Sequence, residues 1–263
     1  MQTLKYGYMT LAWIEQGGQM GKLRNIGRIL ADAVFPPACP GCGQPLGYKE
    51  GAREQICGAC ASKLIYIHEP RCLKCGKEIE KEEAQYCYDC QKQEHRFVQG
   101  TAVYAYTDVV QHSIYRFKYQ NKREYAAFYA KEIRKQCGPQ MKRWHPDAIV
   151  PVPLHISKYR KRGYNQSELI AEILSAILEI PMDNRLLVRS RKTIPMKELN
   201  NEERVKNLEN AFICTQNVVK YNKVILVDDI YTTGSTMDAC AKALMDAGVQ
   251  EVYYVVLSIG KGF

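Results

Sequence analysis

Residues 224–236 read VILVDDIYTTGST, and this stretch joins an apolar run directly to two aspartates and a hydroxyl-rich turn. The run from Val224 to Val227 lacks the polar–apolar alternation of a sheet with one face in water. Continuous apolar runs are typical of strands that are buried on both faces of a parallel sheet. The stretch therefore predicts a central strand of an α/β fold.

The residues after this strand predict a helix and a second strand. Apolar residues recur at helical spacing from Met237 to Met245, and Ser235 with Asp238 has the spacing of a capping box at the start of the helix. A second apolar run, VYYVVLSI, follows at 252–259. Together these elements predict a strand–helix–strand unit with parallel strands.

The turn between the first strand and the helix predicts an anion site. It lies at the carboxyl end of a parallel strand, where open α/β sheets bind ligands. Backbone N–H groups, hydroxyls and a helix N-terminus suit a phosphate, and here they come from Thr232, Thr233, Gly234, Ser235 and Thr236. Asp228 and Asp229 would repel a phosphate, so ribose hydroxyls or Mg²⁺ are their natural partners. The loop predicts a sugar phosphate, against the alternative of an ordinary turn with exposed polar residues.

Other phosphate-binding loops do not match. The chain has neither the G-x-x-x-x-G-K-[ST] spacing of nucleoside triphosphate sites nor the G-x-G-x-x-G spacing of dinucleotide sites. VILVDDIYTTGST resembles the signature with which type I phosphoribosyltransferases bind phosphoribosyl pyrophosphate (PRPP). The resemblance implies that Asp228 and Asp229 hold the ribose 2′ and 3′ hydroxyls, that the 232–236 loop cradles the 5-phosphate, and that Mg²⁺ binds with PRPP.

Composition restricts the class of protein. The 263 residues carry a formal net charge of +9, and residues 111–206 hold 20 Lys and Arg against 10 Asp and Glu. Such a surface suits a pyrophosphate or a nucleic-acid backbone, although a generally basic soluble surface is the alternative. No run of 18 apolar residues exists, and the first 30 residues make a poor signal peptide. We expect a cytoplasmic protein without membrane insertion.

Eight of the eleven cysteines form four C-x-x-C pairs: Cys39 and Cys42, Cys57 and Cys60, Cys72 and Cys75, Cys87 and Cys90. Without a secretory signal, zinc is favoured over disulfides. The second and third cysteines are separated by 14 residues, and the sixth and seventh by 11, which favours sequential pairing into two structural Zn²⁺ sites. An interleaved arrangement, first pair with third, remains open.

The middle of the chain predicts a second strand, loop and helix. Ala148 to Val150 is a short apolar strand, and a cationic loop follows with Lys158, Arg160, Lys161 and Arg162. Asn165, with Glu168 three residues later, predicts the start of an amphipathic helix. In the same sheet as the 232–236 loop, these cations would suit a pyrophosphate, whereas a solvated loop is the alternative for each of them singly.

A second resemblance covers the chain from about Phe35 to its end. FPPACPGCG (35–43), the four C-x-x-C pairs, PVPLHISKYRKRGYNQ (151–166), RSRKTIPMKELNNEERVKNLENAF (189–212) and VDDIYTTGST (227–236) occur in order. They resemble the ComF family of double-zinc-ribbon, phosphoribosyltransferase-like proteins. The resemblance implies a type I phosphoribosyltransferase-like parallel sheet flanked by helices, preceded by a small cysteine-rich double zinc ribbon. It divides the chain into an N-terminal extension and helix (1–34), the ribbons (35–95) and the sheet domain (96–263).

The ComF resemblance also implies a role and site residues. It implies handling of transforming single-stranded DNA during competence, with a DNA helicase as partner. Arg160 and Arg162 match one family block, Arg204 lies in a block that resembles a mobile loop closing over PRPP, and Lys118 matches a family lysine. Met196 stands where the family commonly has glutamine, and residues 1–19 look additional, so that translation starting at Met20 is a hypothesis beside Met1.

Two rival functions stay open. One is a true phosphoribosyltransferase of nucleotide metabolism, and the other is a non-catalytic DNA-binding or docking subunit for a competence helicase. SIYRFKYQNKREYAAFYA (113–130) interleaves aromatic residues with cations, as a single-strand binding surface requires. A helix with an aromatic core face and a basic solvent face explains the same pattern.

Overall fold

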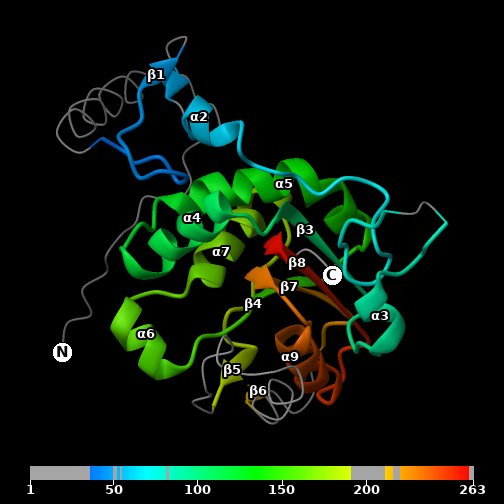
Figure 1. Ribbon diagram of the computed structural model, residues 1–263. Coiled ribbons are helices and arrows are strands. Elements are labelled where there is room, and N and C mark those ends of the chain that lie inside the picture. The colour runs from blue at the N-terminus through cyan, green and yellow to red at the C-terminus, as the bar shows by residue number, and fades with distance from the viewer. Residues whose placement is uncertain are drawn as a thin grey trace, which may run out of the picture.

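A four-stranded parallel sheet forms the centre of the molecule (Figure 1). The computed structural model describes residues 36–49, 52–53, 55–80, 83–190, 211–215 and 220–260. The strands lie in the order β3 (Gln99–Ala105), β8 (Glu251–Ile259), β7 (Lys223–Tyr231) and β4 (Ala148–Pro151). The predicted parallel α/β fold is confirmed, and the two apolar runs are the two central strands.

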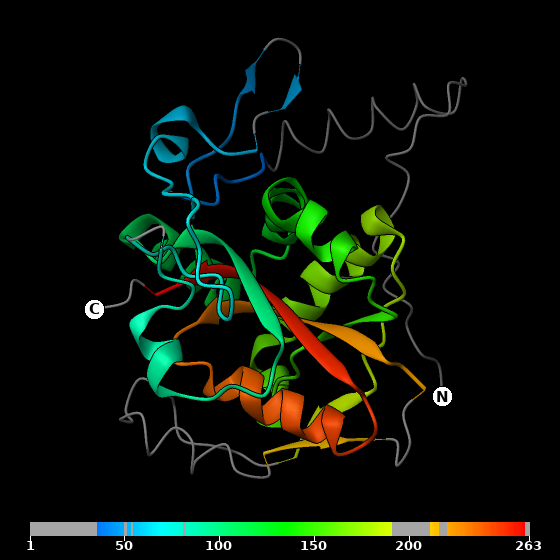
Figure 2. The same ribbon diagram turned by 90° about the vertical axis from the view of Figure 1, so that its right-hand side faces the viewer.

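Both faces of β7 are buried, which is why its sequence shows no alternation. Ile225 and Val227 pack with α5 (Tyr125–Arg143) and α7 (Gln166–Leu178), whereas Val224 and Leu226 pack on the opposite side with α9 (Ser235–Met245). Figure 2 shows α9 on one side of the sheet, with α5 and α7 on the other. The sheet thus separates two cores.

The remaining elements flank these layers. Helix α4 (Asp108–Tyr119) lies on the same side of the sheet as α5 and α7. The antiparallel pair of strands β5 (Leu187–Arg189) and β6 (Phe212–Cys214) lies on the α9 side. None of the helices in the described ranges is both long and apolar enough to cross a membrane.

The cationic segment after β4 is a helix, so the prediction of a loop was wrong. It forms α6 (Ile156–Arg162), which begins where the His155 side chain accepts a hydrogen bond from the Ser157 backbone N–H. It ends at Gly163, whose φ of +81° is the left-handed conformation that favours glycine. The Asn165 side chain then caps α7 as predicted, by accepting from Ser167 N–H at 3.2 Å.

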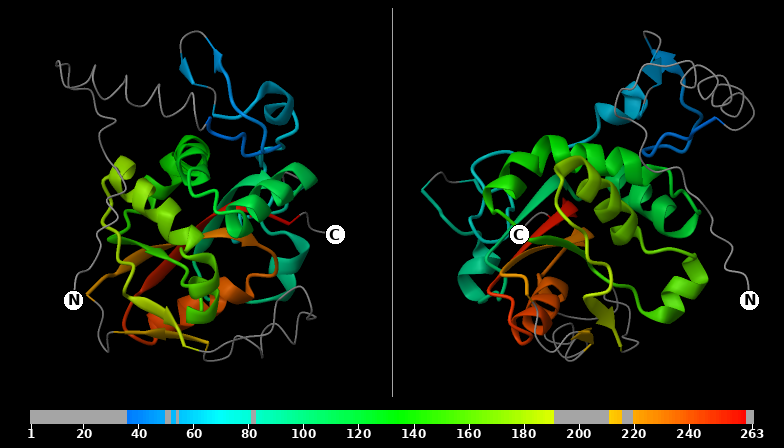
Figure 3. Two further views of the ribbon diagram at one scale, coloured as in Figure 1. Left: turned by 90° about the vertical axis from the view of Figure 1, so that its left-hand side faces the viewer. Right: turned by 180° about the vertical axis from the view of Figure 1, so that it is seen from behind.

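The two cysteine-rich segments sit differently on the sheet domain. The first includes the short strands β1 (Tyr48–Lys49) and β2 (Ala52–Arg53) and helix α2 (Gly58–Ala61), and it lies over α4 and α5 (Figure 3). The second includes α3 (Tyr88–Lys92), and three of its cysteines belong to the core shared by the sheet and α9. The second segment is therefore part of the sheet's hydrophobic core.

Candidate functional site

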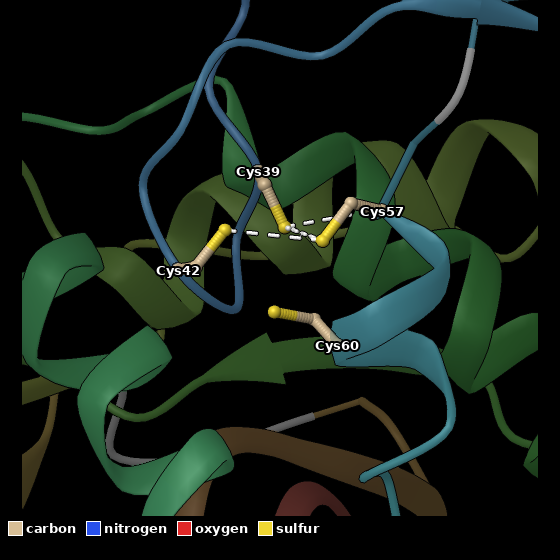
Figure 4. A group of neighbouring side chains, drawn as sticks. All are labelled: Cys39, Cys42, Cys57 and Cys60. Atoms are coloured by element: carbon tan, nitrogen blue, oxygen red, sulfur yellow. Dashed lines mark hydrogen bonds between the residues drawn. The ribbon is translucent and has the colours of Figure 1, made fainter.

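The eight paired cysteines gather into two groups of four, and this geometry settles the pairing. Cys39, Cys42, Cys57 and Cys60 form one group (Figure 4), and Cys72, Cys75, Cys87 and Cys90 form the other, with the sulfurs of each group within 4.8 Å of one another. Four sulfurs bound tetrahedrally at about 2.3 Å from Zn²⁺ lie about 3.8 Å apart. The Sγ atoms of Cys42 and Cys57 are 3.8 Å apart, and those of Cys75 and Cys87 are 3.6 Å apart. Both groups fit zinc, and the sequential pairing is confirmed.

Side chains of the sheet domain hold the first zinc ribbon in place. The Tyr125 hydroxyl donates to the Cys39 carbonyl at 3.1 Å, and the Arg116 guanidinium donates to the Gly41 carbonyl at 2.9 Å. A zinc ion with four thiolates carries two net negative charges, so a nearby arginine also offsets charge. These bonds tie the ribbon to α4 and α5.

The acidic pair lies at the end of β7, where both carboxylates are buried. Asp228 and Asp229 are 9% and 4% exposed. Ser167, at the start of α7, donates its hydroxyl to Asp228 Oδ1 at 2.8 Å. The Lys118 ammonium, from the last turn of α4, forms an ion pair with Asp229 Oδ2. Elements far apart in the chain thus hold the two carboxylates.

Burial and like charge shift the titration of this pair. Burial and the neighbouring Asp229 charge raise the pKa of Asp228 to about 7, against the opposing effects of Lys118 and the Ser167 hydroxyl. Burial disfavours the charged form of Lys118, but the charges of Asp229 and Asp228 outweigh it and raise the pKa of this ammonium. Asp228 therefore takes up a proton at a higher pH than an ordinary aspartate does.

Further cations surround the acidic pair. Burial lowers the pKa of Lys158, and the charges of Arg189, Arg162 and Lys118 lower it further. Burial also lowers the pKa of Arg189, on β5. Several cations that destabilise one another in this way favour an anionic ligand.

The 232–236 loop follows β7 and leads into α9. Residues 230–237 line a hollow of about 30 Å³. The expected capping box is absent: Gly234 is the N-cap residue, and Ser235 bonds Thr233 at 2.9 Å instead. Because no side chain caps α9, its first N–H groups remain available to an anion.

Asp238 bonds to the segment before β3 in place of the helix start. Its Oδ2 lies 2.7 Å from His95 Nδ1, and its Oδ1 accepts from the Arg96 backbone N–H at 2.8 Å. Gly234 has a φ of +86°, and a Cβ there would lie 2.6 Å from the Tyr231 hydroxyl and 2.7 Å from the His95 ring. The loop can therefore take this path only with glycine.

The structure brings most of the predicted site residues together. Asp228, Asp229 and Lys118 are in contact, and the charge of Arg162 reaches Lys118. Arg160 is exposed on α6, and Arg204 lies outside the described residues, as does Met196. The sequence motifs did not single out Ser167, Arg189 or His95. Arg189 opens the 189–212 block, but no local pattern marked Ser167 or His95.

Both halves of the chain match known families. The model of the double zinc ribbon domain matches residues 30–91, and that of the phosphoribosyl transferase domain matches residues 126–261. Competence protein F of Haemophilus influenzae is 35% identical over 211 residues, which cover 76% of this chain and 89% of that protein.

This chain is a member of the ComF family.

Two further relatives agree with this membership. Competence protein ComFC of Bacillus subtilis is 28% identical over 204 residues, covering 74% of this chain and 80% of that protein. DNA utilization protein YhgH of Salmonella typhimurium is 30% identical over 226 residues, covering 83% and 95%. Both relatives are matched over most of their own length.

Proposed function

We propose that this ComF-family protein binds PRPP with Mg²⁺ and uses that site in handling transforming single-stranded DNA in the cytoplasm. One observation carries the proposal: two buried carboxylates lie among cations and next to an uncapped helix N-terminus. Carboxylates accept hydrogen bonds from hydroxyls, whereas cations and N–H groups bind phosphates. A sugar phosphate carries both groups, and the names of the relatives support the role in competence.

Each part of the site has a role in this proposal. Asp228 and Asp229 accept hydrogen bonds from the ribose hydroxyls, and the 232–236 loop binds the 5-phosphate. Lys158, Arg162 and Arg189 bind the pyrophosphate, and the family resemblance adds Arg160 and Arg204 to them. The carboxylates fit an Mg²⁺ ion that arrives with its ligand, because Mg²⁺ in proteins is commonly held by one or two carboxylates and substrate phosphates. Bound there, Mg²⁺ would neutralise part of the negative charge of the pyrophosphate.

With an acceptor present, the same groups support phosphoribosyl transfer, a glycosyltransferase reaction. The bond between the anomeric carbon and the pyrophosphate oxygen breaks with both electrons leaving on pyrophosphate, and a lone pair of the acceptor forms the new bond. Positive charge develops on the ribose in between, and the carboxylates of Asp228 and Asp229 stabilise it. The cations stabilise the departing pyrophosphate, and no protein nucleophile is needed.

Calorimetric titration with PRPP and Mg²⁺ tests the site. The wild type is expected to bind saturably, and the Asp228→Asn/Asp229→Asn variant is expected to lose binding. Asp246→Asn is a matched control, since Asp246 is an exposed aspartate at the C-cap of α9, paired with Lys242. A folded, zinc-loaded wild type that binds no PRPP would refute the site.

For single-stranded DNA, we propose that α4 presents the contact surface. Tyr115 and Tyr119 are 55% and 63% exposed, their ring centroids are 5.0 Å apart, and the Arg162 guanidinium lies 5.3 Å above the Tyr119 ring. Phe117 and Tyr125 of the 113–130 segment are buried, so those two rings belong to the aromatic core face and are not available for stacking. Exposed rings beside cations suit bases and phosphates of a single strand.

Binding of oligothymidine and of an abasic strand of equal length separates stacking from charge. Tyr119→Ala is expected to weaken oligothymidine binding by roughly tenfold, since stacking on an aromatic side chain contributes about 1–3 kcal/mol per base. Abasic binding should change little. Tyr88→Ala is the control, because Tyr88 is also exposed and lies under a cation, Lys92, but on the second ribbon. Equal loss for both strands would contradict the stacking role.

The rival functions make different predictions. A phosphoribosyltransferase of nucleotide metabolism releases pyrophosphate with a free nucleobase and does not need DNA. A docking subunit retains its phenotype when Asp228 and Tyr119 are replaced. The helicase partner rests on the family resemblance, and copurification of a DNA helicase with the full chain from the same cells tests it.

A further inference from the structure

The second zinc ribbon and the 232–236 loop are connected by side chains that the proposed chemistry does not use. His95 follows the ribbon, and its side chain is 1% exposed. A carboxylate only accepts hydrogen bonds, so His95 Nδ1 donates to Asp238 Oδ2 at 2.7 Å. The Arg96 N–H donates to the other oxygen at 2.8 Å. Residues 143 positions apart in sequence are thereby joined across the base of the loop.

A series of ring-to-ring contacts continues this connection to the zinc site. His95 stacks on Phe97 at 4.7 Å, and Phe97 meets the Tyr254 ring edge-on at 4.9 Å. The Tyr254 hydroxyl donates to the carbonyl of Cys75, a zinc ligand, at 2.8 Å. Tyr254 also stacks on Tyr231, the residue that the loop follows, at 5.0 Å. The path from zinc ligand to loop is made of buried, directly contacting groups.

The ribbon's backbone strengthens the same contact. The Gly100 N–H of β3 donates to the Lys74 carbonyl at 2.8 Å. Gly76 has a φ of +71°, and a Cβ there would lie 2.5 Å from the Gly100 carbonyl oxygen. The ribbon backbone therefore lies directly against the strand, and the ribbon cannot loosen without disturbing the edge of the sheet.

The position of Asp238 explains why this connection matters for an anion. Asp238 lies in the first turn of α9, where a free carboxylate would compete with a phosphate for the helix N-terminus. His95 and the Arg96 N–H hold both carboxylate oxygens on the ribbon side. The first N–H groups of α9 are thereby left for a ligand, although an acid is present in the same turn.

We infer that His95 and Asp238 are positioning residues of the sugar-phosphate loop, and that they couple zinc at Cys72, Cys75, Cys87 and Cys90 to ligand binding at residues 232–236. This inference rests on the proposed function for the identity of the ligand, but not for the connection itself. Coupling of two sites is reciprocal, so PRPP that orders the loop also steadies the ribbon. Zinc at the second site thereby becomes a condition for a formed PRPP loop.

Hydrogen exchange of the zinc-loaded full chain, without ligand, tests the connection. His95→Ala is expected to speed amide exchange across 232–238 on the order of tenfold, the effect of losing a hydrogen bond to a charged group. His95→Asn places an amide N–H near the position of Nδ1 and is expected to restore slow exchange. Arg116→Ala is the matched control, because it removes a bond to the first ribbon, at Gly41, and should leave 232–238 unchanged.

The second arm adds PRPP with Mg²⁺. In the wild type, ligand is expected to slow exchange in 232–238 and also in 72–91, whereas His95→Ala abolishes the effect on 72–91. Unchanged loop exchange in a folded His95→Ala protein would overturn the inference. If the wild type binds no PRPP, and loop exchange is still faster in His95→Ala, the proposed function is refuted but the connection stands. The two failures are therefore distinguishable.

Discussion

Replacing Asp228 with asparagine is expected to stabilise the protein while removing PRPP binding. The wild type buries two adjacent carboxylates, and only Asp229 has an ion-pair partner, Lys118. A carboxyl whose pKa rises from 3.8 to about 7 on folding carries a penalty of about 4 kcal/mol at most in its charged form. Asparagine keeps the shape and can still accept from Ser167, so we expect a net gain of about 1–3 kcal/mol above pH 7.

The pH dependence gives the sign of the effect. The folded-state pKa of Asp228 lies above the unfolded one, so its contribution to wild-type stability is complete below about pH 4 and is lost as the pH rises through 7. The variant lacks this dependence. Its advantage should therefore be greatest near pH 8 and should shrink as the pH falls toward 4.

Denaturant unfolding of both proteins at pH 5 and pH 8 measures this difference. At pH 8 the gain corresponds to several degrees in melting temperature, at about 2–4 °C per kcal/mol for a chain of this size class. Asp229→Asn is the control: it leaves Lys118 without its ion-pair partner, so it should not stabilise. Parallel pH profiles for the wild type and Asp228→Asn would refute the reasoning.

Four further substitutions test other parts of the structure. Gly234→Ala should destabilise by about 2–4 kcal/mol and weaken PRPP binding, because the new Cβ meets the Tyr231 hydroxyl at 2.6 Å in a left-handed backbone; a normal melting temperature with full PRPP affinity would contradict this. Cys87→Ser should lower the melting temperature of the whole sheet domain, because Cys87 belongs to the core that the sheet shares with α9. Cys57 lies outside both core clusters, so Cys57→Ser should leave calorimetric PRPP binding intact. If the two variants changed the melting temperature and PRPP binding equally, the difference between the ribbons would be contradicted. Lys118→Met should cost about 3–5 kcal/mol in denaturant unfolding, since the second aspartate stays buried without its cation, and a cost below about 1 kcal/mol would count against the ion pair.

Local patterns were sufficient for the elements of the fold. The apolar runs around Val227 and Val255 predicted the central strands because a strand buried on both faces needs apolar residues at every position. The helix that begins after Asn165 was predictable because its cap and apolar stripe lie within a few residues. The α6 helix was missed because its exposed cations carry no apolar stripe, and its limits depend on His155 and Gly163.

The sequence by itself determined the eight zinc ligands and the acid–loop order of the site, since each depends on spacings of a few residues that local geometry limits. The structure settled which pairs of cysteines share an ion. Only the tertiary structure decided which groups surround the acids: Ser167 bonds a carboxylate 61 positions away, and Lys118 reaches Asp229 from another helix. It also decided that the second ribbon belongs to the sheet's core and that His95 holds Asp238. These contacts follow from the packing of surfaces that are distant in the chain, and no local spacing encodes which surfaces meet.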